Sequence, residues 1–219
     1  MFDANCLKLM FVAGSQDFYH IKGGKNDRIN ALLDALELAL QSKITAFQFR
    51  QKGDLALQDP IEIKQLALEC QKRCQKYGVP FIINDEVQLA LELKADGVHV
   101  GQEDMAIEEV MTLCKKHQFI GLSVNTLEQA LKARHLDGVA YLGVGPIFPT
   151  QSKKDKQVVG VELLKKIKDS GVKKPLIAIG GITTYNASKL REYGGIAVIS
   201  AIAQAKDKAL AVEKLLNNA

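Results

Sequence analysis

Charged side chains follow the short apolar runs of this sequence, and their types suit phosphate and metal chemistry. Arg50 and Lys52 come directly after one run, and Asp85 and Asp104 follow the next two runs along the chain. Mg²⁺ is usually held by one or two carboxylates together with phosphate oxygens of a substrate. These residues therefore predict a site where a phosphorylated ligand binds together with a divalent cation.

A second set of groups suits another phosphate. Ser123 and Ser200 offer hydroxyls and Lys153 offers a positive charge. Gly180-Gly181 leads toward a predicted helix, and the free N–H groups at the start of a helix attract anions. Taken with the first set, the pattern predicts two phosphorylated ligands, one of them bound to a metal ion.

Short apolar runs must position these groups, because the groups lie at or beyond the ends of the runs. Between the runs, apolar residues recur with the 3.6-residue period of an amphipathic helix, as in Ile29, Leu32, Leu36 and Leu40. The runs are residues 8–14, 45–49, 80–84, 97–101, 119–124, 140–145, 175–180 and 195–200.

Most runs lack in–out alternation, which is typical of parallel strands buried on both faces. Eight strand–helix units in 219 residues predict an α/β fold, a single-domain (β/α)8 TIM barrel spanning residues 1–219. The alternative is an open doubly wound sheet, which would need edge strands with a more polar face. In a barrel, Asp85 and Asp104 would follow neighbouring strands about 4.8 Å apart, so both could reach one cation.

Several of these residues also have a structural interpretation, which the sequence leaves open. Asp85 followed by Gln88 fits a helix capping box, and Asp104 could cap a helix that begins near Ala106. Gly180-Gly181 could form a tight turn, with Thr183 or Thr184 as the next cap, and Lys153 with Lys154 could be a solvated charge run.

For Ser123 the structural interpretation is weaker, because Thr126 and Gln129 already supply a capping box for the following helix. His99 lies between two valines of a predicted strand and is expected to be a hydrogen-bonded core histidine. Cys70 and Cys74 fall on one apolar helical stripe and are expected to be core thiols. The long non-periodic stretch 146–160 is expected to be functional.

Composition narrows the class of protein. With 47% hydrophobic and 25% charged residues the chain can bury one large core. The net charge of +4 is spread along the chain, and its densest basic run (153–156) has no interleaved aromatic residues, which favours small anionic ligands over nucleic acid. No apolar run approaches the roughly 18 residues of a membrane span. Because the four cysteines form no C-x-x-C pair and the first residues lack a signal-peptide pattern, we expect a cytoplasmic protein.

Five longer segments occur in an order and spacing typical of one enzyme family. They are "QFRQK" (48–52), "FIINDEVQLALELKADGVHVGQED" (81–104), "GLSVNT" (121–126), "YLGVGPIFPTQSKKD" (141–155) and "IAIGGIT" (177–183). On these segments the chain resembles the thiamine-phosphate synthase family over nearly its whole length. The resemblance implies a transferase that joins 4-amino-2-methyl-5-(diphosphooxymethyl)pyrimidine to 4-methyl-5-(2-phosphooxyethyl)thiazole, forming thiamine phosphate and diphosphate.

The resemblance also implies roles for individual residues. Asp85 and Asp104 would hold Mg²⁺, and Arg50, Lys52, Ser123 and Lys153 would be catalytic. The pyrimidine diphosphate would contact the "QFRQK" segment (Gln48, Phe49, Arg50, Gln51, Lys52) and Asn84, Ser123 and Lys153. The thiazole phosphate would contact Thr150, Gln151, Ser152, Gly181, Ile199 and Ser200.

Three positions depart from the family's usual pattern. Gln51 replaces a glutamate, Gln151-Ser152 replaces Glu-Thr, and Asn125 stands where a histidine is frequent. In an extended segment Gln51 would point away from Arg50 and Lys52, so this change is expected to spare the phosphate site. The second change bears on the affinity for the thiazole.

Three alternatives to a synthase are weighed on the same residues. The thiazole tautomerases of the same fold tend to use a histidine near position 125, so Asn125 favours the synthase. A non-catalytic regulator would have lost the diphosphate and metal groups, which are present here. An isomerase barrel would need a general acid and base at the strand ends, whereas this set is better suited to a metal and a diphosphate.

Overall fold

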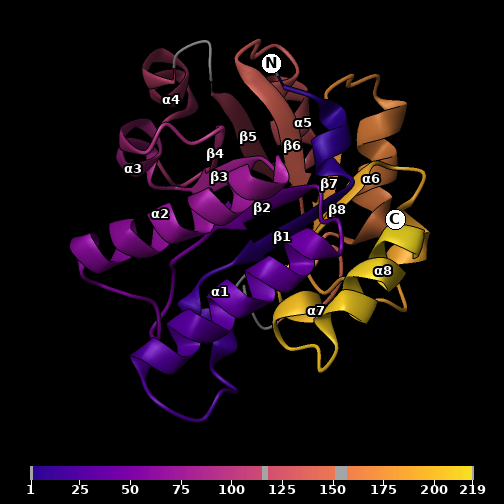
Figure 1. Cartoon of the computed structure of the whole chain (residues 1–219). Coiled ribbons are helices and arrows are strands. Elements are labelled where there is room, and N and C mark those ends of the chain that lie inside the picture. The colour runs from indigo at the N-terminus through magenta and orange to yellow at the C-terminus, as the bar shows by residue number, and fades with distance from the viewer. Residues whose placement is uncertain (1, 115–117, 151–156, 219) are drawn as a thin grey trace.

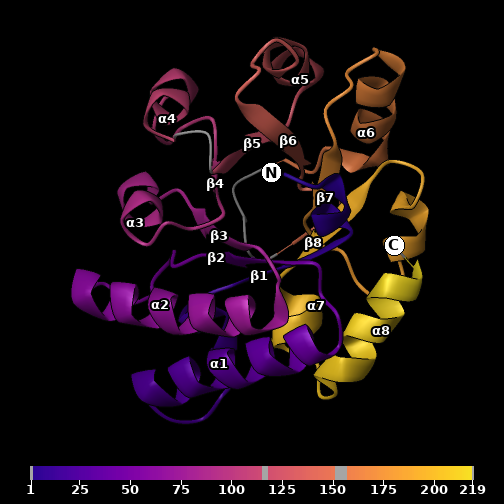
Figure 2. The ribbon, with the colours of Figure 1, turned by 45° about the horizontal axis from the view of Figure 1, so that its top comes forward.

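Eight parallel strands close into a barrel in which each strand pairs with the next and β8 pairs with β1. The computed structural model describes residues 2–114, 118–150 and 157–218. The barrel occupies the centre of the molecule and the helices surround it (Figures 1 and 2). The strands are β1 (Leu9–Ala13), β2 (Ala46–Phe49), β3 (Phe81–Asn84), β4 (Gly97–Val100), β5 (Phe119–Val124), β6 (Val139–Val144), β7 (Leu176–Ile179) and β8 (Gly195–Val198).

The outer layer consists of α-helices and short 3-10 helices. Helices α1 and α2 lie side by side against one side of the barrel, as both views show. The α-helices are α1 (Lys25–Gln41), α2 (Pro60–Tyr77), α3 (Val87–Glu92), α4 (Ile107–Leu113), α5 (Leu127–Ala133), α6 (Gly160–Asp169), α7 (Ser200–Ala203) and α8 (Lys208–Asn218). The 3-10 helices are η1 (Ala4–Leu7), η2 (Ser15–Phe18) and η3 (Ala187–Leu190).

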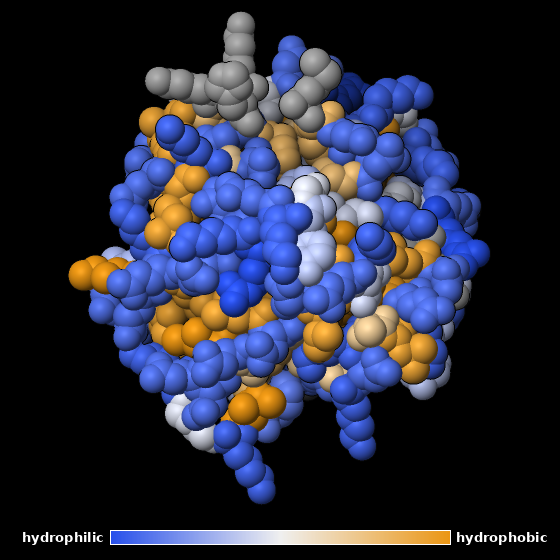
Figure 3. All heavy atoms as spheres, viewed as in Figure 1, coloured by the Kyte–Doolittle hydropathy of each residue, from blue (hydrophilic) through white to orange (hydrophobic). Residues whose placement is uncertain are grey.

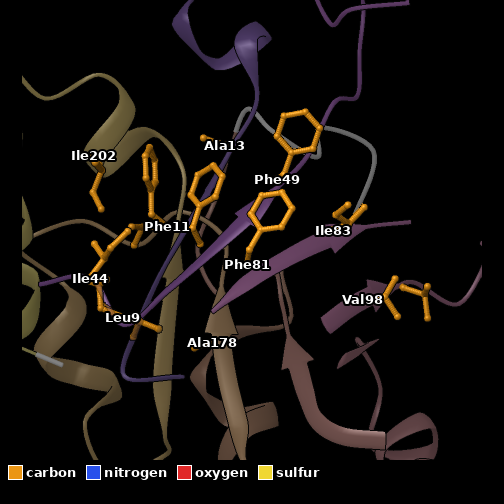
Figure 4. Packing of buried hydrophobic residues seen from close by; sticks show 14 of the residues in the cluster. Leu9, Phe11, Ala13, Ile44, Phe49, Phe81, Ile83, Val98, Ala178 and Ile202 are labelled. Carbon is orange, nitrogen blue, oxygen red and sulfur yellow. The ribbon is translucent and has the colours of Figure 1, made fainter. Parts of the chain in front are cut away.

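Alternate residues of each strand face two different cores. In β1, Leu9, Phe11 and Ala13 pack outward in the cluster shared with the helices, while Met10 and Val12 pack in the interior of the barrel. Figure 4 shows the outer cluster, where Phe11, Phe49 and Phe81 from three successive strands lie near one another. Both faces are apolar, which explains why the strand sequences lack in–out alternation.

The strand prediction is confirmed, since every predicted run contains one strand of the closed barrel within one or two residues. An open doubly wound sheet is excluded by the pairing of β8 with β1. Gly180-Gly181 forms a turn, the alternative that the sequence left open, and the helix expected after it is a short 3-10 helix that begins beyond this turn. Both glycines have positive φ (100° and 65°), and the chain then turns through 3-10 helix η3. A left-handed backbone turns the chain away from the strand direction, and glycine adopts it without strain.

Helix α2 shows how the local sequence sets the ends of an element. The Asp59 side chain accepts a hydrogen bond from the Ile61 N–H, Pro60 occupies the first turn, and Gly78 ends the helix in a left-handed conformation. Cys70 and Cys74 are buried free thiols on its inner face, as predicted. The helix therefore begins and ends where its own residues satisfy its terminal backbone groups.

The surface is mixed in polarity. On the face shown in Figure 3, hydrophobic side chains show in patches that hydrophilic side chains interrupt. Among the described residues, no helix is both long and apolar enough to cross a membrane.

Candidate active site

The interior of the barrel carries polar side chains near the carboxyl ends of the strands. Gln48 of β2, Asn84 of β3, His99 of β4 and Ser123 of β5 line one internal cavity. The backbone pairs Asn84 beside His99 across β3 and β4. Because inward and outward residues alternate, these four occupy the inward positions of adjacent strands. The cavity lies where a barrel of this class places its chemistry.

Asp85 and Asp104 lie together beyond β3 and β4. The Lys52 ammonium is 2.7 Å from Asp85 Oδ2 and 3.6 Å from Asp104 Oδ1. One cation thus contacts both carboxylates. The two carboxylates therefore lie close enough together to share one cationic partner, which here is the Lys52 ammonium.

The two carboxyl groups affect each other's protonation. Burial raises the pKa of Asp85, the hydrogen bond from Lys52 opposes this, and the neighbouring Asp104 adds to the rise. At Asp104, burial also acts to raise the pKa, but hydrogen bonds to Asp85, the Gly101 N–H and Lys52 outweigh it, so the pKa falls. The pair therefore favours a cation between its oxygens, since a positive charge relieves the repulsion of two ionised carboxylates.

The capping interpretation of these two residues is wrong. Helix α3 has Glu86 at its N-cap and α4 has Ala106, and neither helix receives a side-chain capping bond there. Asp85 instead has a left-handed backbone with φ of 63°, and its N–H donates to the His99 carbonyl oxygen at 2.8 Å. Its side chain is free to face the cleft. The capping box of Thr126 and Gln129 at α5 is present as predicted.

Arg50 and Lys52 line the same cleft as the acidic pair, together with Asn84 and Ser123. Gln51 points elsewhere, as expected for an extended segment: its side-chain oxygen accepts from Ser15 Oγ and the Leu57 N–H, both at 3.1 Å. The Gln51 side chain therefore stabilises the loop after β2. The structure gives its side chain no place in the cleft.

The prediction for Phe49 needs correction. Its side chain is buried in the outer core, with its ring centroid 6.3 Å from that of Phe81 (Figure 4). The neighbouring Gln48 faces the interior of the barrel. Strand alternation accounts for the difference, because consecutive residues of β2 point to opposite faces.

A second pocket adjoins the cleft that holds Asp85 and Asp104, which is called the first pocket below. Five residues of its wall were singled out from the sequence: Thr150, Gly180, Gly181, Ile199 and Ser200. Gly145 and Ile179 line both this pocket and the cleft with the acidic pair. The two sets of groups predicted for two phosphorylated ligands therefore meet at one point. Gln151, Ser152 and Lys153, which belong to the prediction, lie outside the described residues.

Other residues of the site were missed by sequence reasoning. Gln16 Nε2 donates to the Arg50 carbonyl oxygen at 2.7 Å and to Asp17 Oδ2 at 2.9 Å, which holds the backbone that carries Arg50. Tyr141 of β6 contacts His99 inside the barrel. An apolar strand sequence gives no sign of which residue faces inward, so Tyr141 could be found only from the strand register.

Three comparisons with known proteins point to the same family. The family model described as thiamine monophosphate synthase matches residues 18–202. The chain belongs to the thiamine monophosphate synthase family. It is similar to the thiamine-phosphate synthase of Helicobacter pylori strain Shi470, with 94% identity over 219 residues and 100% of both chains covered.

More distant members of the family support the same assignment. The thiamine-phosphate synthase of Pasteurella multocida strain Pm70 is 53% identical over 216 residues, covering 97% of this chain and 96% of the relative. A solved structure titled thiamine phosphate pyrophosphorylase, from Pyrococcus furiosus, is 36% identical with a TM-score of 0.81, covering 98% of this chain and 96% of the other. The family therefore extends over the barrel and both pockets.

Proposed function

We propose that the protein is a thiamine-phosphate synthase, a transferase that joins a pyrimidine methyl diphosphate to a thiazole phosphate and releases diphosphate. The observation that carries this proposal is the pair of pockets that meet at Gly145 and Ile179. One pocket has cationic and acidic groups suited to a metal-bound diphosphate. The other has glycines and hydroxyls suited to a second phosphate. A bond between two ligands requires that they meet, and the shared wall allows it.

We propose Mg²⁺ as the cation of the first pocket. The donor set fits it: Asp85 and Asp104 offer hard carboxylate oxygens, and Lys52 contacts both carboxylates at once. Among the described residues no group of three or more His, Cys, Asp or Glu side chains could hold a metal ion, so the diphosphate would supply further oxygens. When bound, the ion would stabilise the negative charge that collects on the leaving diphosphate.

The residues of the first pocket would bind and orient the pyrimidine diphosphate. Arg50 and Lys52 would pair with its phosphates, and Lys52 would then exchange a carboxylate partner for a phosphate oxygen. Lys153, which lies outside the described residues, is proposed to join them. Donors aimed at a leaving group stabilise the charge that develops there, which supplies several kcal/mol in enzymes of many classes.

The second pocket would hold the thiazole phosphate. Backbone N–H groups near Gly181, the Ser200 hydroxyl and the Thr150 hydroxyl are groups suited to a phosphate, and Ile199 would pack against the ring. The attacking ring nitrogen has no proton to lose, so the reaction requires no general base. Gln151 and Ser152 are proposed to complete this pocket.

We also propose that the protein works in the cytoplasm with these two small-molecule substrates. All four cysteines are free, which agrees with a reducing compartment.

The test is the reaction itself. Purified protein supplied with both substrates and Mg²⁺ should form thiamine phosphate, read as thiochrome fluorescence after oxidation. Mixtures that omit one substrate serve as controls and should give no signal. Conversion of the thiazole phosphate to an isomer, without thiamine phosphate, would replace the synthase with a tautomerase, and absence of any product under saturating conditions would overturn the proposal.

A further inference from the structure

Asn186 joins two points of the loop that follows β7. Its Oδ1 accepts a hydrogen bond from the Thr183 N–H at 2.8 Å, and its Nδ2 donates to the Gly181 carbonyl oxygen at 3.0 Å. A backbone N–H only donates and a carbonyl oxygen only accepts, so these two partners fix the orientation of the amide group. Asn186 lies at the N-cap position of η3 but makes no side-chain capping bond to that helix. Its side chain bonds to the preceding loop instead.

The loop needs such a bond because glycine leaves its backbone free to adopt several conformations. A Cβ atom at Gly181 would lie 2.7 Å from both the Cβ atom and the carbonyl oxygen of Phe148, so the close approach of the two loops requires glycine. The peptide before Gly181 is already fixed, because the Gly180 carbonyl oxygen accepts from the Phe148 N–H at 3.0 Å. The peptide between Gly181 and Ile182 is fixed by Asn186.

The bond between Asn186 and the Gly181 carbonyl also sets the direction of the next N–H. In a trans peptide the C=O and N–H bonds point in opposite directions, so the Ile182 N–H points away from Asn186. Gly181 and Ile182 belong to the wall of the second pocket, whereas Asn186 does not. The Ile182 side chain is buried in the outer core. The group that Ile182 can offer to a ligand of this pocket is therefore its backbone N–H, a donor suited to an anion.

We propose that Asn186 is a positioning residue that turns the Ile182 N–H into the second pocket, where it donates to the phosphate of the thiazole substrate. The inference rests on the proposed function, which assigns the thiazole phosphate to this pocket. With the peptide flipped, the Gly181 carbonyl oxygen would face the phosphate, and the negative charges of the two groups would repel each other. Asn186 therefore favours a phosphorylated thiazole over its phosphate-free alcohol without contacting either ligand.

Asn186→Ala tests the proposal by removing both side-chain bonds. We expect KM for the thiazole phosphate to rise about 10-fold, the effect of one lost hydrogen bond to a charged group. Because the first pocket is unchanged, kcat and KM for the pyrimidine diphosphate should stay within about 2-fold of the wild type. The preference for the thiazole phosphate over the phosphate-free alcohol, measured as a ratio of kcat/KM values, should also fall about 10-fold. An unchanged preference in this variant would overturn the proposal.

Thr183→Val is the matched control. Thr183 Oγ1 accepts from the Tyr185 N–H at 3.3 Å, a side-chain hydrogen bond within the same loop that does not involve Gly181. Valine keeps the branched shape and removes the hydroxyl. The preference for the thiazole phosphate should therefore stay within about 2-fold of the wild type. An equal fall in both variants would mean that the stability of the loop sets the preference, and Asn186 would then have no positioning role.

The amide chemical shift of Ile182 gives a measurement that does not depend on turnover. Inorganic phosphate and, at lower concentration, the thiazole phosphate should each shift this amide signal of the wild-type protein until the site is saturated. Thr183→Val should keep this response and Asn186→Ala should lose it. An Ile182 amide that responds to neither ligand in the wild type would overturn this inference alone. Wild-type protein that forms no thiamine phosphate would instead overturn the proposed function, so the two failures are distinguishable.

Discussion

At the scale of single residues, Asp85 combines an unusual backbone with a candidate metal ligand. Its φ of 63° is left-handed, a region that aspartate and asparagine enter more readily than most residues. The turn at this residue places the side-chain oxygen 2.7 Å from Lys52. Asp85 therefore does two things at the end of β3: it adopts the backbone conformation of the turn, and it supplies a negative charge to the cleft.

Substitutions at Asp85 should separate these two roles. Asp85→Asn and Asp85→Ala should both lower turnover greatly, because both remove the carboxylate. Asp85→Asn should unfold within about 0.5 kcal/mol of the wild type, because asparagine also enters the left-handed region readily. Asp85→Ala should lose about 1–2 kcal/mol, the cost of left-handed backbone for a residue without such a short polar side chain. Urea unfolding and steady-state turnover measure the two effects. Unimpaired turnover in either variant would remove Asp85 from the metal site.

At the scale of elements, η2 braces the end of β2. Asp17 of η2 accepts from the Gly14 N–H at 2.9 Å and from Gln16 Nε2 at 2.9 Å, and Gln16 in turn holds the Arg50 carbonyl oxygen. Burial raises the pKa of Asp17 to about 6, while the bonds from Gly14 and Gln16 and the charge of Arg50 act to lower it. This carboxyl group of η2 therefore has a pKa of about 6 in the folded protein.

This titration should appear in the stability of the protein. Because the pKa of Asp17 is raised in the folded state, its favourable contribution is complete below the unfolded pKa, near 4, and is lost as pH rises through about 6. Asp17→Asn does not titrate. As the pH rises from about 4 to about 7, the unfolding free energy of the variant should therefore increase relative to that of the wild type by on the order of 2 kcal/mol.

Urea unfolding at several pH values measures this difference. Asp27→Asn serves as the control, because Asp27 makes the matching bond to the Gly24 N–H at the start of α1, in an exposed position. Asp27→Asn therefore shows how much stability is lost when the same kind of hydrogen bond is weakened in a solvent-exposed position. Parallel stability curves for the wild type and Asp17→Asn would contradict the prediction.

At the scale of the whole molecule, the barrel and the proposed metal site are mechanically separate. Eight strand pairings close the barrel, and its two cores pack on opposite faces of the strands. Asp85 and Asp104 lie in loops beyond the strands, outside both cores. We therefore expect the fold to be independent of a cation bound between them.

Removal of divalent cations should separate activity from folding. A chelator should abolish thiamine phosphate formation, and Mg²⁺ should restore it, whereas sodium at the same ionic strength should not. Thermal unfolding by circular dichroism should shift by less than about 2 °C, the lower end of the effect of a change of 1 kcal/mol in a domain of about 150–250 residues. A large loss of thermal stability on chelation would indicate a structural ion instead.

The sequence by itself determined the barrel and most of the candidate site. Apolar runs at regular spacing place eight strands, and strand order alone brings Asp85 and Asp104 to neighbouring loops. Local signals also sufficed for the capping box of Thr126 and Gln129. These features follow from periodicity and from short-range hydrogen bonding, both of which can be read along the chain.

Only the tertiary structure decided which way individual side chains face. Phe49 packs in the outer core and Gln48 in the interior, although both lie in one apolar run. Asp85 adopts a left-handed turn instead of a cap because its N–H reaches the His99 carbonyl oxygen on the next strand. Tyr141 meets His99 through the register of β4, β5 and β6. Such contacts join residues far apart in sequence, and closure of the barrel brings them together.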